Sequence, residues 1–129
     1  MVVLGLNYYY HDSTACIVVD GKLVVAIEEE RLSRDKHSKA FPHRAIDRCL
    51  KIAKLNYNDI DHVAVSINPK HNIAKKLTYW AFHTNKISAV KAFARNEVGH
   101  VYMKQRSFRS WYKKHYTSKT KSPKVHFIP

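Results

Sequence analysis

The chain has 129 residues, a length that fits one domain with a single core. Hydrophobic residues make up 45% of it and the formal net charge is +13, a balance that excludes a disordered chain of low hydrophobicity. The sequence shows no secretory leader and no run of about 20 apolar residues, so it predicts a cytoplasmic protein without a membrane segment.

The N-terminal part of the chain predicts three strands in sequence. Residues 2–8 form a short apolar run rich in β-branched and aromatic side chains, and residues 15–19 and 23–27 are similar. Asp20-Gly21 joins the second run to the third and is a strong hairpin signal. We therefore expect an antiparallel meander, followed by a polar and basic loop over residues 31–41.

A helix and a fourth strand follow this meander. Pro42 suits the first turn of a helix, and the apolar side chains over residues 45–53 share one helical face. Residues 56–61 predict a turn, and residues 62–67 predict a strand. A strand, helix and strand in this order favour a parallel crossover.

The second half of the chain is mainly helical in character. Residues 71–118 carry helical periodicity, with Asn85 as a possible helix cap, although no boundaries are evident in residues 104–121. Ser122-Pro123 interrupts this region, and residues 124–128 predict a fifth strand. Two cysteines, Cys16 and Cys49, match no metal-binding spacing and are expected in the core of a reduced protein.

Positive charge is concentrated in the second half. Residues 1–64 carry nine basic and nine acidic side chains, whereas residues 65–129 carry fourteen basic side chains and one acid, Glu97. This asymmetry is typical of a surface that meets an anion, of a solvated helix face, or of a surface that meets an acidic part of the same protein. With Tyr102, Phe108, Trp111, Tyr112 and Tyr116 among the basic residues, a nucleic-acid-binding or partner-docking module without catalysis is the alternative function.

Several short motifs occur in one order along the first half of the chain. They are Leu4-Gly5-Leu6-Asn7, His11-Asp12-Ser13-Thr14-Ala15-Cys16, Asp20-Gly21, Ala26-Ile27-Glu28-Glu29-Glu30-Arg31, Lys36-His37, Phe41-Pro42 and Ala45-Ile46. This series resembles the N-terminus of the NodU/CmcH-type carbamoyltransferases. The resemblance covers about residues 1–67.

The resemblance implies a fold and a reaction. The fold is α/β: the ribonuclease H-like half-domain of actin-like ATPases, a mixed five-stranded sheet with helices. We expect residues 1–129 to form a single N-terminal subdomain with a basic helical insertion at about residues 70–121. The implied reaction uses carbamoyl phosphate and ATP to make carbamoyl adenylate, and then transfers the carbamoyl group to a hydroxyl of a small-molecule acceptor.

The family also implies a divalent metal ion such as iron, held by a His-His-x-x-His cluster after the fifth strand. The sequence contains no such cluster, so no metal ligand of that kind is expected within this chain. We expect a chain truncated at its C-terminus, inactive alone, and partnered by the missing C-terminal portion or by another chain.

His11 is the predicted catalytic residue. It follows the first strand, and strand ends are where ligands tend to bind in α/β sheets. An imidazole titrates near neutral pH and can accept the proton of an attacking hydroxyl. A structural histidine that hydrogen-bonds a loop carbonyl is the alternative. Asp12 and Ser13 are predicted either to contact an anionic substrate or to shape the turn, and Thr14 is expected to donate hydrogen bonds to such an anion together with Ser13.

Two charged clusters complete the predicted substrate- and phosphate-binding set. Glu28 and Glu30 share one face if the third strand continues, where they are expected to orient an acceptor or to pair with Arg31. Lys36 and His37, with Arg31 and Arg34, are predicted to hold the phosphate of carbamoyl phosphate or of a nucleotide. A charged strand end and a solvated basic loop are the alternatives for these clusters.

Overall fold

The computed structural model describes residues 1–9, 12–66, 75, 78, 79, 82, 99–116 and 121–128, with the side chains of residues 99–104 excepted. The chain divides into two compact units. The first comprises Met1–Asn68 and Trp111–Pro129, and the second comprises Pro69–Ser110. The first unit contains the whole sheet and every site residue considered below. In the described residues, no helix combines the length and apolar character needed to cross a membrane.

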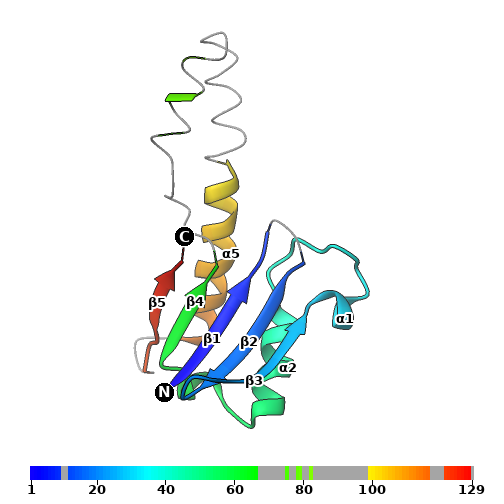
Figure 1. Ribbon diagram of the computed structural model, residues 1–129, viewed down its shortest axis with the longest axis vertical. Helices are drawn as coiled ribbons and strands as arrows, with labels where there is room; N and C mark the ends of the chain where they lie inside the picture. The colour runs from blue at the N-terminus through cyan, green and yellow to red at the C-terminus, as the bar shows by residue number, and fades with distance from the viewer. Residues whose placement is uncertain are drawn as a thin grey trace. The chain divides into compact units, whose positions relative to one another are not determined.

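A five-stranded mixed sheet forms the first unit, in the order β3-β2-β1-β4-β5 (Figure 1). Its strands are β1 (Val2–Asn7), β2 (Thr14–Val19), β3 (Lys22–Glu28), β4 (His62–Val65) and β5 (Lys124–Phe127). β1, β2 and β3 pair antiparallel, whereas β4 runs parallel to both β1 and β5. The α/β fold with a mixed five-stranded sheet is thus confirmed.

The hairpin between β2 and β3 turns on two residues with left-handed backbone. Asp20 has φ 49° and Gly21 has φ 80°, which is the geometry of the two-residue turn that matches strand twist. The register is regular from Thr14↔Glu28 to Ile17↔Val25 and shifts between Ile17 and Val18. This pairing places the end of β3 directly beside the start of β2.

The helices are α1 (Glu30–Ser33), α2 (His43–Ala53) and α5 (Gly99–His115), with a 3-10 turn η1 (Tyr57–Asp59) before β4. α2 agrees with the predicted helix, and η1 lies within the predicted turn. The expectation of an unbroken loop over residues 31–41 was wrong, because α1 occupies its start. The predicted cap at Asn85 lies outside the described residues, while α5 gives residues 104–115 a helical conformation.

The core lies on one face of the sheet. Leu4, Ile17 and Val63 are fully buried there, together with Ile46 and Cys49 of α2. Figure 1 shows α2 behind the sheet, and Cys49 Sγ lies 3.4 Å from the carbonyl oxygen of Ala15 in β2. On the opposite face, small side chains line an open hollow of about 260 Å³; they include Gly5, Cys16 and Ala64.

Asp61 joins three parts of the sheet at the start of β4. Its carboxylate accepts hydrogen bonds from the ammonium of Lys121 and from the backbone N–H of Val2. Its backbone N–H donates to Val2, and its carbonyl accepts from Lys124. These contacts lower the pKa of Asp61 to about 2. The hydrogen bond from Lys121 has the larger effect, and the one from the Val2 N–H has the smaller.

We expect Asp61→Asn to change the acid stability of the protein. Because the folded pKa is depressed, the carboxylate stabilises the fold at pH values above its ordinary pKa, and this contribution is lost as the pH falls toward 2. The urea midpoints of wild type and variant should differ at neutral pH and converge between about pH 4 and pH 2. A difference that stays constant with pH, or that Asp35→Asn reproduces, would contradict this role.

Candidate functional site

The candidate site lies at one edge of the sheet, where β1 ends, β2 begins and β3 ends. The Asn7↔Thr14 pair lies at this edge of β1 and β2, and the Thr14↔Glu28 pair lies at this edge of β2 and β3. The loop after α1 also reaches this edge, because Ser13 contacts Ser38. Residues that are distant in sequence therefore meet here.

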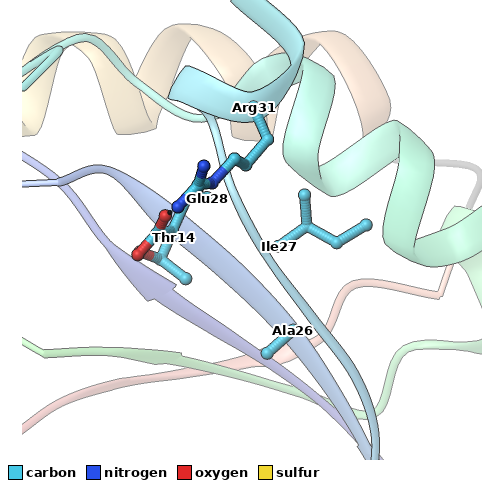
Figure 2. A pocket seen from close by; sticks show the side chains of 5 residues that line it. All are labelled: Thr14, Ala26, Ile27, Glu28 and Arg31. Carbon is cyan, nitrogen blue, oxygen red and sulfur yellow. Dashed lines mark hydrogen bonds and ion pairs between the residues drawn. The ribbon is translucent and has the colours of Figure 1, made fainter. Parts of the chain in front are cut away.

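A cavity of about 420 Å³ opens at this edge. It is lined by Thr14, Ala26, Ile27, Glu28 and Arg31. Figure 2 shows the Arg31 side chain reaching from α1 toward Thr14 and Glu28. The predicted residues Glu28 and Arg31 are thus placed on one hollow, and Thr14 adds a hydroxyl.

Arg31 lies between two carboxylates. Its Nε is 3.3 Å from Glu28 Oε2 and 3.9 Å from Glu30 Oε1. The side chain of Arg31 is 74% exposed, so these surface ion pairs contribute little stability. They orient a guanidinium that has five N–H donors, and the remaining donors can bind an anion in the cavity.

Asp12 and His37 meet although they are far apart in sequence. His37 Nδ1 lies 3.1 Å from Asp12 Oδ1, and the backbone N–H of His37 donates to Glu30 Oε2 at 3.2 Å. The carbonyl oxygen of Asp12 accepts a hydrogen bond of 2.8 Å from the Thr14 hydroxyl. The structure thereby brings three of the predicted residues together beside the cavity.

Two loops lie at this edge, one after β1 and one after α1. They contain most of the described non-glycine residues that have a positive φ. Six described non-glycine residues have positive φ, and four of them lie in these loops: Tyr9 at 89°, Asp12 at 37°, Arg34 at 61° and His37 at 55°. Such conformations cost roughly 1–3 kcal/mol each and cluster at functional sites. The aromatic residue Tyr9 is the least expected of them.

Ser13 has a structural position. It is 1% exposed, and its hydroxyl lies 3.0 Å from the carbonyl oxygen of Ser38 and 2.5 Å from that of Ala40. Its backbone carbonyl accepts a hydrogen bond from Glu29. One hydroxyl proton is shared between two loop carbonyls, so Ser13 fastens the loop to the sheet and is not exposed to a ligand.

The remaining predicted residues are placed differently. His11, the predicted catalytic residue, lies outside the described residues. Lys36 is exposed in the loop after α1 and is not among the residues that line the cavity. Its predicted contact with phosphate stays a prediction.

Glu29 is a residue that sequence reasoning missed. It lies between Glu28 and Glu30 but is 5% exposed, and its carboxylate accepts hydrogen bonds from the backbone N–H groups of Arg44 at 3.3 Å and Ala45 at 2.8 Å. The first N–H groups of a helix have no acceptor within the helix, and a negative charge near them is favourable. Glu29 thus fixes α2 against the end of β3. The third strand does not continue as expected, because β3 ends at Glu28 and Glu29 has helical backbone, so strand alternation does not explain its inward position.

Comparison with known proteins identifies the family of this chain. The model of the carbamoyltransferase N-terminus matches residues 2–127. An uncharacterised protein of Synechocystis, sll1178, is 40% identical over 81 residues, which are 62% of this chain and 13% of that protein. Nodulation protein NolNO of Sinorhizobium fredii is 47% identical over 58 residues, which are 45% of this chain and 8% of that protein.

A third relative is an uncharacterised 19.2 kDa protein from Rhizobium etli. It is 43% identical over 58 residues, which are 45% of this chain and 34% of that protein. The matches therefore span about a third or less of each of these relatives. Since the family model covers nearly the whole chain, this chain belongs to the carbamoyltransferase N-terminus family.

Proposed function

We propose that this chain forms part of an O-carbamoyltransferase that moves a carbamoyl group from carbamoyl phosphate to a hydroxyl of a small-molecule acceptor. The reaction uses ATP and passes through carbamoyl adenylate. The observation that carries this proposal is the family match over residues 2–127. The cavity lined by Glu28 and Arg31 supports placing the proposed active site at this edge of the sheet.

In the transfer step, the acceptor hydroxyl attacks the carbonyl carbon of carbamoyl adenylate. A new C–O bond forms, the bond between that carbon and the phosphate oxygen breaks, and AMP leaves with its negative charge. Arg31 is suited to bind the phosphate oxygens, because a guanidinium donates to them in a bidentate manner. His11 is proposed to accept the hydroxyl proton.

The family resemblance also implies a metal ion held by a His-His-x-x-His cluster. None of the nine histidines is adjacent to another in the sequence, so the residues present do not fit that pattern. No step of the transfer proposed here goes through that metal.

The structure weakens the alternative of nucleic-acid binding. Trp111 and Tyr116 are 1% and 5% exposed, and Phe108 is 6% exposed. Rings buried to this degree do not offer their faces for base stacking. The basic side chains of α5 remain, but three of the five aromatic residues on which that alternative rested are in the protein interior.

An assay of carbamoyl transfer tests the proposal. The protein from its native source should form a carbamoylated acceptor only when both ATP and carbamoyl phosphate are present. Arg31→Met should lower kcat/KM by at least about tenfold, because it removes a charge-assisted contact to the phosphate. Arg48→Met, which removes an exposed arginine from α2, should have little effect. Equal losses in the two variants, or product formation without ATP, would contradict the proposal.

A further inference from the structure

Three potential metal ligands converge beside the cavity. The carboxylates of Asp12 and Glu30 and the imidazole of His37 each offer one ligand atom, and these atoms all lie within 4.8 Å of one another. The residues come from the loop after β1, the first residue of α1 and the loop after α1. A cluster built from three separate parts of the chain depends on the fold and not on a local run of charge.

Hydrogen bonds already hold the three groups in place. His37 Nδ1 lies 3.1 Å from Asp12 Oδ1, and the His37 backbone N–H donates to Glu30 Oε2 at 3.2 Å. Asp12 is held in turn through its carbonyl oxygen, which accepts from Thr14 and from the Asn7 side chain. Side chains that such contacts already orient lose less conformational entropy when they bind a metal ion.

We propose that Asp12, Glu30 and His37 bind one divalent transition metal ion. Two carboxylates balance the charge of the ion and suit Mn²⁺, and an imidazole beside them favours Fe²⁺ or Zn²⁺ over Mg²⁺ and Ca²⁺. Three protein ligands leave coordination positions open to water or to an oxygen of a ligand.

The adjoining cavity supplies a second reason for this assignment. Arg31 lines the cavity and lies 3.9 Å from Glu30, so the cluster and the cavity share a boundary. An oxyanion bound by Arg31 in the cavity would therefore lie beside the metal ion. The metal site goes beyond the proposed transfer reaction and does not depend on it.

Titration of the full chain with Mn²⁺ tests the site directly. The electron paramagnetic resonance signal of free Mn²⁺ should decrease as one ion binds per chain, and the bound ion should show nuclear coupling to an imidazole nitrogen. Asp12→Asn, Glu30→Gln and His37→Asn should each weaken binding by at least about tenfold. His37→Asn should also abolish the nitrogen coupling.

These substitutions are chosen to preserve the fold. Asparagine tolerates left-handed backbone, which positions 12 and 37 require at φ 37° and 55°. Circular dichroism of each variant checks that the fold is retained.

Two control variants address binding elsewhere. Asp35→Asn removes an exposed carboxylate from the same loop. His126→Asn removes one member of an imidazole pair on β4 and β5, in which His62 Nδ1 and His126 Nε2 are 3.0 Å apart. Both controls should bind Mn²⁺ as wild type does. Unchanged binding in the three ligand variants, loss of binding in His126→Asn, or no binding by wild type would overturn the proposal, whatever the transfer assay gives.

Discussion

Replacing Trp111 with alanine is expected to cause the largest loss of stability in this chain. Trp111 is 1% exposed, and its ring packs against Phe41 and Tyr57 with centroid distances of 5.5 and 6.1 Å. Removing a buried tryptophan costs about 3–5 kcal/mol, because the protein loses the burial and retains part of the cavity. Urea unfolding should show this loss as a lower midpoint with an unchanged slope.

Two further variants make the result for Trp111 interpretable. Trp111→Phe retains most of the ring and should cost less than the alanine variant, and it supplies a value if the alanine variant does not fold. Lys113→Ala changes an exposed residue in the same helix and should be nearly neutral. A cost below about 1 kcal/mol for Trp111→Ala would show that the end of α5 does not complete the core.

Replacing Glu29 with alanine is expected to have the second-largest effect. The variant would leave the backbone N–H groups of Arg44 and Ala45 without their acceptor, and Ala45 is fully buried. Hydrogen bonds to a charged group contribute about 1.5–3 kcal/mol, and a carboxylate at a helix N-terminus adds a favourable dipole interaction. We expect a loss of about 2–4 kcal/mol in the free energy of unfolding.

The same substitution should also disturb the candidate site. Glu29 lies between Glu28 and Glu30 in the sequence, so we expect a change in its position to displace these two neighbours as well. Glu29→Gln keeps an acceptor oxygen and should lose less stability than Glu29→Ala. Asp35→Asn, an exposed change in the adjoining loop, serves as the control and should be nearly neutral. Equal stability of Glu29→Ala and wild type would contradict the capping role.

The strands were predictable because their signals are local. Alternating or continuous apolar runs mark β1 to β5, and Asp20-Gly21 specifies a turn whose geometry the structure reproduces. The parallel pairing of β1 with β4 follows from the helix between them. The helix α1 was missed because four residues are too short to display helical periodicity.

The residues of the candidate site could be named from the sequence, but their positions relative to one another could not. Motif resemblance identified Asp12, Glu30 and His37 as candidates, yet no spacing in the sequence indicates that they meet. Their contact depends on how the loop after α1 folds back onto the end of β1, where the Ser13 hydroxyl fastens it to Ser38. A serine in a turn looks the same in sequence whether it binds a ligand or a loop carbonyl.

In the proposed function, the edge formed by β1, β2 and β3 binds the anionic part of a carbamoyl donor. The most direct measurement is a titration of the isotopically labelled full chain with AMP, the leaving group of the transfer step, followed by amide NMR shifts. We expect saturable shifts that are largest at Thr14, Glu28 and Arg31, and these shifts should be lost in Arg31→Met. Shifts confined to the basic residues of α5, or no saturable shifts, would contradict it.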